Sequence, residues 1–240
     1  MAQRCGGLYP LHSTLRRFYL LYGTGSGMSR KIDCAACGIN PCSTGNSNQS
    51  FDGCPMNTAK EVLENASEVY KSELREMAHA AALVEAKGYM RWTRVEDTIE
   101  FARAMGYRKL GIACCVGLKR EGAILESILR KNGFEVSSAV CKTGGVPKEE
   151  LGIKDEEKVR PRGFEAMCNP IAQAMLLDSA GSQLNILVGL CVGHDALFTK
   201  ASKAPVTTLV AKDRVLGHNP VAAIYNHQSY YRERLYEDHV

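Results

Sequence analysis

Four cysteines lie close together near the amino end of the sequence, in a segment with little other reason to fold. They are Cys34, Cys37, Cys42 and Cys54, four of the ten cysteines in the chain, and their neighbours are rich in Gly, Asn and Ser. A tetrahedral zinc ion or a four-iron cluster needs four thiolates, and metal binding can supply the folding energy that such a segment lacks. We therefore expect all four to be metal ligands.

The number of cysteines in this amino-terminal quartet is more informative about metal binding than their spacing. It lacks the two C-x2-C pairs that are typical of a zinc ribbon, whereas the closing Cys54-Pro55 is similar to the end of a ferredoxin cluster motif. The alternative is a set of redox-active or incidental loop thiols without a metal. Iron and zinc both remain open for this segment.

A second group of cysteines is connected by the predicted topology. Cys114 and Cys115 follow the first predicted strand, Cys141 ends the second and Cys191 follows the third. The carboxyl ends of parallel strands share one edge of a sheet, which is where α/β proteins bind ligands. Cys168 stands just before an Asn-Pro helix start, where backbone N–H groups favour a thiolate or an anionic cluster. We predict that these five thiols converge on one metal-binding pocket.

Not all five need to be ligands. Adjacent residues of an extended strand point to opposite faces, so we expect only one of Cys114 and Cys115 to face the metal. The alternative for the whole group is packing, because free cysteine is often a small buried hydrophobe.

Polar side chains are predicted on the same edge of the sheet. Lys119 follows the double cysteine, Lys142 follows Cys141, and His194 and Asp195 follow Cys191. We interpret these four residues as positions that bind an anionic substrate, although a charged residue after a strand is often only a solvated loop residue or a helix cap. Further charged residues on this rim are Arg120, Lys212 and Asp213.

The elements that position these residues follow from the apolar pattern. Thr58 and Glu61 form a capping-box pair that opens a long amphipathic helix ending near Gly88, and Thr93 and Glu96 open a shorter one. Four short apolar runs then alternate with helical segments, which indicates an α/β fold: a small, mostly parallel sheet of about four strands covered by helices. These runs are Leu110–Ala113, Phe134–Val140, Leu184–Leu190 and Val206–Val210. Between the second and third runs, residues 142–162 predict a long surface excursion.

The chain divides into three parts in this interpretation. Residues 1–27 are expected to be a non-native or disordered extension, with Met28 as the natural start and no role for Cys5. Residues 28–56 form the Cys-rich metal-binding segment, and residues 57–240 contain the helical lead-in and the α/β domain. No signal peptide or membrane span is predicted, which favours a cytoplasmic, thiol-reducing location and argues against structural disulfides.

Charge and missing motifs narrow the possible functions. The net charge of +4 comes from four arginines in the first 30 residues, so the rest of the chain is balanced and predicts no broad nucleic-acid surface. The turn after the first strand contains neither a dinucleotide fingerprint nor a phosphate loop, and the chain has no Gly-x-Ser-x-Gly nucleophile elbow.

The cysteine motifs together resemble those of a known family. They are Cys34-x2-Cys37, Cys114-Cys115-Val116-Gly117, Cys168-Asn169-Pro170 and Gly189-Leu190-Cys191-Val192-Gly193-His194-Asp195. The chain from about Cys34 to Tyr225 is similar to bacterial and archaeal proteins of unknown function described as uncharacterised metal-binding proteins. The resemblance implies metal binding through the cysteines but no particular reaction.

Three functions are compatible with these residues. The first is an iron–sulfur protein, most simply with a four-iron cluster (4Fe-4S) on the strand-end cysteines, for redox or sulfur-removing chemistry on a small molecule or with a redox partner. The second is a zinc-binding structural or interaction module without catalysis. The third is a metal-free thiol redox protein that uses the Cys114-Cys115 pair.

Overall fold

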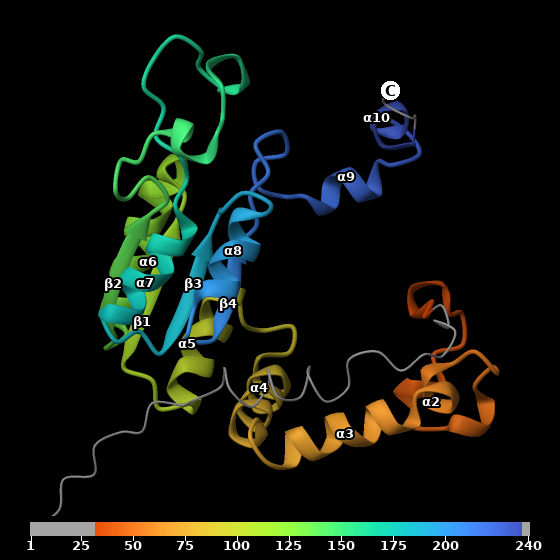
Figure 1. Cartoon of the computed structure of the whole chain (residues 1–240). Helices are drawn as coiled ribbons and strands as arrows, with labels where there is room; N and C mark the ends of the chain where they lie inside the picture. Colours follow the sequence, from red (N-terminus) through yellow and green to blue (C-terminus); the bar gives the residue numbers. More distant parts are fainter. Residues whose placement is uncertain (1–31, 237–240) are drawn as a thin grey trace, which may run out of the picture. The chain divides into compact units, whose positions relative to one another are not determined.

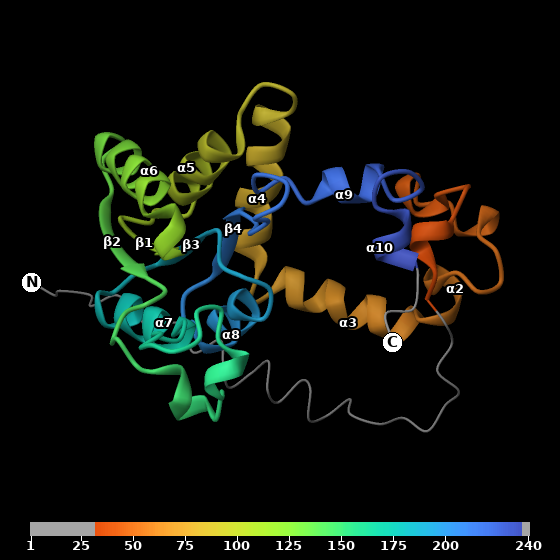
Figure 2. The same cartoon turned by 90° about the horizontal axis from the view of Figure 1, so that it is seen from above.

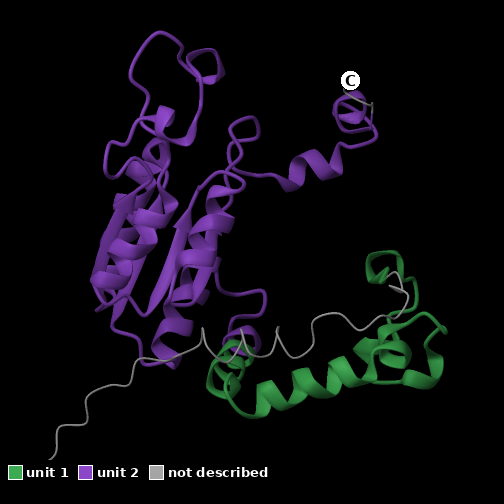
Figure 3. Cartoon of the chain, in the orientation of Figure 1, with its two compact units in different colours: residues 1–83 green, residues 84–240 purple. Residues whose placement is uncertain are grey.

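The computed structural model of the protein describes residues 32–236, which form two compact units divided between Leu83 and Val84 (Figure 3). The extension expected over residues 1–27 therefore lies outside the described residues. The first unit contains the 3-10 turns η1 (Cys34–Ala36), η2 (Pro41–Ser43) and η3 (Ser47–Gln49), then α2 (Pro55–Thr58), α3 (Lys60–Lys71) and most of α4 (Arg75–Gly88).

The second unit is an α/β domain, as predicted (Figure 1). Its strands are β1 (Lys109–Cys114), β2 (Glu135–Val140), β3 (Leu184–Val188) and β4 (Val206–Val210). Its α-helices are α5 (Arg94–Ala104), α6 (Lys119–Lys131), α7 (Pro170–Ser179), α8 (His194–Ala201), α9 (Val221–Tyr225) and α10 (Arg232–Tyr236), with 3-10 turns η4 (Val116–Leu118), η5 (Lys148–Leu151) and η6 (Asp155–Glu157).

The four strands form one parallel sheet in the order β2-β1-β3-β4. Every residue of β3 is buried, and five of the six residues of β1 are buried, as expected for central strands covered on both faces. Helices α5 and α6 cover one face, and α7 and α8 cover the other (Figure 2). The core between these layers includes Ile112 and Ile186 of the sheet, Leu129 of α6 and Phe198 of α8.

This strand order places a topological switch point between β1 and β3. The connection from β1 to β2 runs through α6 on one face of the sheet, whereas the connection from β3 to β4 runs through α8 on the opposite face. The loops that leave β1 and β3 therefore diverge, and ligands of open α/β sheets bind where this happens.

Two helix starts of this domain follow the sequence prediction. Thr93 and Glu96 form a reciprocal capping box at α5, and the Asn169 side chain accepts a hydrogen bond from the Ala172 N–H at α7, with Pro170 in the first turn. Both features satisfy backbone N–H groups that a helix leaves unpaired at its amino end.

The single long helix expected between residues 58 and 88 is instead two helices, α3 and α4. The Ser72 hydroxyl and N–H both donate to the Glu68 carbonyl oxygen, and the Ser72 backbone leaves the helical region, which ends α3. The predicted capping box of Thr58 and Glu61 is also wrong, because the Thr58 hydroxyl donates to the Cys54 carbonyl oxygen and the first residue before α3 is Ala59.

The first unit has little hydrophobic core. Between residues 32 and 83 the only buried apolar side chains are those of Pro41, Cys54 and Ala80, and α3 contains no buried residue. Burial alone therefore supplies little of the free energy that orders this unit. Among the helices of residues 32–236, none combines the length and apolar character needed to cross a membrane.

Candidate functional site

The cysteines of the α/β domain lie at the carboxyl edge of the sheet, where backbone hydrogen bonds connect the segments that carry them. The Cys115 N–H donates to the Val188 carbonyl oxygen at the end of β3 (3.0 Å), and the Cys141 N–H donates to that of Cys114 (2.9 Å). The Asn169 N–H in turn donates to the Cys141 carbonyl oxygen (2.7 Å), which fixes the start of α7 beside the end of β2. Each cysteine in residues 32–236 is a free thiol.

Cys114 and Cys115 are adjacent but have different surroundings, as the alternation along a strand requires. The Cys114 sulfur packs against α6, where a methyl group placed on Gly122 would lie 3.2 Å from it. Burial, followed by the neighbouring Cys115, raises the pKa of the Cys114 thiol. The Cys115 sulfur instead lies near Gly117, in the loop that leaves β1. Cys114 is therefore a packing residue, and Cys115 is the member of the pair that belongs to the site.

Cys141 and Cys168 form a hydrogen-bonded pair. The Cys141 thiol donates to the Cys168 sulfur, which lowers the pKa of Cys168 to about 5, with the charges of Lys142 and His194 acting in the same direction. The same bond, followed by burial, raises the pKa of Cys141. The Cys141 sulfur also accepts a hydrogen bond from the Val116 N–H at 3.3 Å. Within the pair, the Cys168 thiol therefore has the lower pKa and the Cys141 thiol the higher one.

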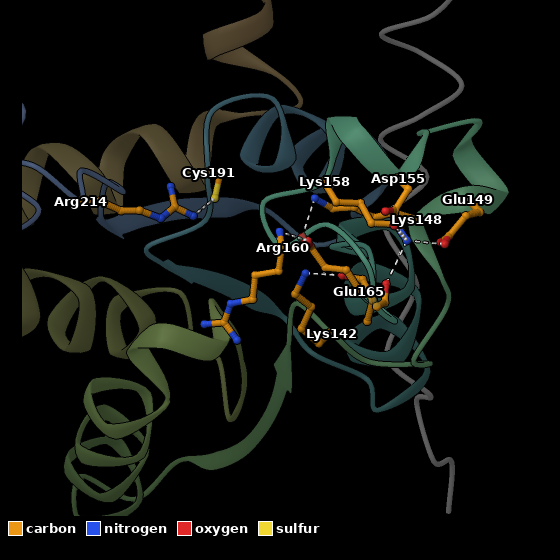
Figure 4. A network of polar contacts seen from close by, with 11 residues as sticks. Lys142, Lys148, Glu149, Asp155, Lys158, Arg160, Glu165, Cys191 and Arg214 are labelled. Atoms are coloured by element: carbon orange, nitrogen blue, oxygen red, sulfur yellow. Dashed lines mark hydrogen bonds and ion pairs between the residues drawn. The ribbon is translucent and has the colours of Figure 1, made fainter.

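Cys191 has an arginine partner that the sequence analysis did not identify. Arg214 follows β4, and its Nη2 donates to the Cys191 sulfur at 3.1 Å (Figure 4). This bond, followed by the charges of Cys191, Cys115 and Cys168, raises the pKa of Arg214. Arg214 therefore lies within electrostatic range of three of the four cysteines. Its position after β4, on the edge shared by all four strands, was the signal in the sequence that could have identified it.

The residues predicted to bind a substrate have mixed roles. His194 begins α8 and contributes to lowering the pKa of the Cys168 thiol. Lys119 is exposed at the start of α6. Lys142 donates to the Ala166 carbonyl oxygen, so its ammonium group also holds the chain beside Cys168. The Asp195 carboxylate accepts from the Ala196 N–H at 2.8 Å and so interacts with the first turn of its own helix.

Gln173 is a buried residue of the site that the sequence analysis missed. Its amide nitrogen donates to the Ala139 carbonyl oxygen (2.7 Å) and to that of Cys114 (3.2 Å), which ties α7 to the ends of β2 and β1. Its amide oxygen is buried without a hydrogen-bond partner in the described part of the chain. A glutamine within an apolar helix gives no signal in the sequence for such a role.

The excursion after Cys141 is an ordered loop that returns the chain to Cys168. Lys158, whose side chain is 3% exposed, donates to Glu149 (2.5 Å), to Asp155 (3.0 Å) and to the Gly163 carbonyl oxygen (2.9 Å). Lys148 and Glu165 form a second, partly buried ion pair at 2.6 Å (Figure 4). The loop between the two cysteines is therefore held by a polar network, while Cys141 is buried in the core and Cys168 packs against it.

The amino-terminal quartet belongs to the first unit. Cys34 and Cys42 are exposed, Cys37 is half-buried, and Cys54 is buried directly before α2. Throughout residues 32–236, no three His, Cys, Asp or Glu side chains are grouped as they would be around a single metal ion. The quartet and the strand-end cysteines are thus free thiols whose role as ligands remains a prediction.

Comparison with known proteins gives the family of the chain. Residues 54–209 match the model of a family described as "Protein of unknown function (DUF1847)". The chain belongs to this family. An uncharacterized protein of Methanocaldococcus jannaschii, MJ0455, is 45% identical over 206 residues, which cover 86% of this chain and 99% of that protein.

The DUF1847 match includes Cys54 and all the strand-end cysteines, whereas Cys34, Cys37, Cys42 and Arg214 lie outside it. The predicted relation to a family of unknown function, with an archaeal member, is confirmed. Neither description mentions a metal, so the metal-binding part of the resemblance stays a prediction.

Proposed function

We propose that this DUF1847 protein holds a metal centre at the carboxyl edge of its sheet, and that the centre is an iron–sulfur cluster. The ligands in this proposal are Cys115, Cys141, Cys168 and Cys191. The observation that carries it is that Arg214 donates to the Cys191 sulfur and feels the charges of Cys115 and Cys168, while the fourth cysteine, Cys141, is hydrogen-bonded to Cys168. Four thiols from four separate segments thus share one electrostatic environment.

The surroundings of the thiols fit an anionic cluster. Iron and zinc bind thiolates, so a four-cysteine site accumulates negative charge. Arg214 and Lys142 supply positive charge beside it. The Val116 N–H and the Arg214 guanidinium already donate to sulfur, and hydrogen bonds to sulfur are one of the means by which a protein sets a cluster potential.

We favour a cluster over a single zinc ion because both need four thiolates but a cluster also supplies redox chemistry. Zinc bound by the same four cysteines is the alternative that metal analysis separates from it.

Such a centre would supply electron transfer, or Lewis acidity if one iron keeps an open position. The protein itself contributes orientation: the Cys141 and Cys168 segments are fixed by the Asn169 hydrogen bond, and Gln173 holds the strand ends beneath them. Arg214 keeps a positive charge at the Cys191 sulfur.

The test is anaerobic purification of the full chain followed by an absorption spectrum and analysis of iron, acid-labile sulfide and zinc. We expect a brown protein with iron and sulfide in equal amounts, and we expect Cys191→Ser to lose most of both. A colourless protein that contains stoichiometric zinc, or an iron content unchanged by Cys191→Ser, would contradict the proposal.

A second candidate is metal-free thiol chemistry. One observation favours Cys141 and Cys168 as the reactive pair, in place of the Cys114-Cys115 pair considered from the sequence. Cys168 is half-buried, hydrogen-bonded to Cys141, and carries a lowered pKa, which is the environment of a reactive thiol with a neighbouring resolving thiol. A protein that folds fully without iron or zinc and forms a Cys141–Cys168 disulfide with diamide would support this function in place of the cluster.

For the amino-terminal quartet we propose a structural metal site. Its support is the shortage of buried apolar side chains between residues 32 and 83, which leaves metal binding as the source of folding energy. The test is the metal content of a variant in which Cys34 and Cys37 are both Ser. A loss of metal in addition to that caused by Cys191→Ser supports a separate site, and an unchanged content contradicts it.

A further inference from the structure

Lys212 follows β4, and its ammonium group reaches the switch point between β1 and β3. A methyl group placed on Gly117 would lie 3.8 Å from the Lys212 Nζ, and one placed on Gly189 would also lie 3.8 Å from it. Gly117 is in the loop that leaves β1, and Gly189 is in the loop that leaves β3. The ammonium group therefore lies between the two loops that diverge at this point.

Lys212 is half-buried, and its ammonium group forms no ion pair or hydrogen bond within the described part of the chain. Ammonium groups are costly to remove from water unless they are paired with an acceptor. The neighbouring Asp213 does not pair with it; its Oδ1 accepts from the N–H groups of Val215 and Leu216 at 2.9 and 2.8 Å. Lys212 thus presents an unpaired positive charge where α/β sheets bind ligands.

Gly117 keeps space open at this charge, whereas the space beside Gly189 is filled by Leu118, whose Cδ1 would lie 1.9 Å from an added methyl group. A methyl group on Gly117 would meet only the Lys212 Nζ and the Cys115 sulfur, both at ordinary van der Waals distance. The position next to Gly117 therefore lacks the atoms that would otherwise cover the Lys212 charge.

We propose that Lys212 binds the oxyanion of a small molecule, a carboxylate or a phosphate group, at this switch point. The methyl group placed on Gly117 would also lie 3.9 Å from the Cys115 sulfur, so the bound anion would lie next to a proposed cluster ligand. Anion binding by Lys212 does not depend on the cluster; only the interpretation of the anion as the cluster's substrate rests on the proposed function.

The experiment is calorimetric titration of the anaerobically purified full chain, at low chloride, with inorganic phosphate and separately with acetate. The variants are Lys212→Met and the control Lys200→Met, which removes the same charge from an exposed position on α8. We expect Lys212→Met to weaken binding of the preferred anion at least about tenfold, as for loss of a charged hydrogen bond. We expect Lys200→Met to stay within about twofold and both variants to keep the wild-type iron and sulfide content.

Three results would overturn the proposal. They are unchanged affinity in Lys212→Met, equal losses in both variants, and loss of iron together with anion binding in Lys212→Met, which would make Lys212 a charge partner of the cluster. If Lys212→Met does not fold, wild-type protein decides: phosphate must protect Lys212, and not Lys200, from acylation by an N-hydroxysuccinimide ester. A wild-type protein that binds phosphate through Lys212 but contains no iron would refute the cluster and leave the anion site standing.

Discussion

The contact between Gly189 and Leu118 connects the loops that leave β3 and β1, and it can be tested with one methyl group. Gly189 has a φ of +67°, which L-residues adopt at a cost of about 1–2 kcal/mol. A methyl group at Gly189 would also lie 1.9 Å from Cδ1 of Leu118, whose side chain is buried. Forcing an extra methyl group into a packed position costs about 1–3 kcal/mol. We therefore expect Gly189→Ala to lower the free energy of unfolding by about 2–5 kcal/mol.

Gly152→Ala is the matched control, because Gly152 has a φ of +75° and no atom within 4 Å of the added methyl group. It carries the backbone cost of about 1–2 kcal/mol without the clash. Urea unfolding followed by circular dichroism measures both variants, and the denaturant slope should stay constant. A Gly189→Ala variant as stable as Gly152→Ala would refute the close packing of these two loops.

Two further predictions concern the elements around the site. Thr93→Ala removes the capping box with Glu96 at α5 and should cost about 0.5–2 kcal/mol in the same urea assay, whereas an unchanged midpoint would mean that the cap does not stabilise the domain. In the loop after Cys141, hydrogen bonds from Lys158 lower the pKa values of Glu149 and Asp155, so their stabilisation is present above the pKa values of the unfolded chain and is lost as the pH falls through the lower folded values. Hydrogen exchange of residues 147–166, corrected for intrinsic rates, should show constant protection between about pH 5 and 9 and a loss of protection below roughly pH 4. The Lys158→Met variant should show no such loss. Equal pH profiles of the two proteins would contradict this role of Lys158.

The fold of the α/β domain could be predicted because each strand can be recognised from a short stretch of sequence. Strands β1 and β3 are buried on both faces, so they appear as continuous apolar runs, and the helical segments between the runs require parallel pairing. Parallel pairing in turn predicts that Cys115, Cys141 and Cys191 share one edge. The break at Ser72 could not be predicted, because it depends on a side-chain hydrogen bond to Glu68 that competes with a continuous helical pattern.

The candidate site was only partly visible in the sequence. Alternation along β1 predicts that one of Cys114 and Cys115 faces away, but only the packing of Cys114 against Gly122 identifies which. Arg214 and Gln173 were missed because their partners, the Cys191 sulfur and two strand-end carbonyl oxygens, are distant in sequence and follow no period. The Lys158 network is hidden for the same reason, since its ion pairs lie within irregular loop structure.

The most direct test of the central proposal compares two adjacent residues. Cys114→Ala and Cys115→Ala each remove one buried sulfur, but only Cys115 belongs to the proposed cluster site. Iron and acid-labile sulfide per chain should fall sharply in anaerobically purified Cys115→Ala and stay at the wild-type level in Cys114→Ala. Equal iron contents in these two variants, whether both high or both low, would contradict a cluster bound at the carboxyl edge of the sheet through Cys115.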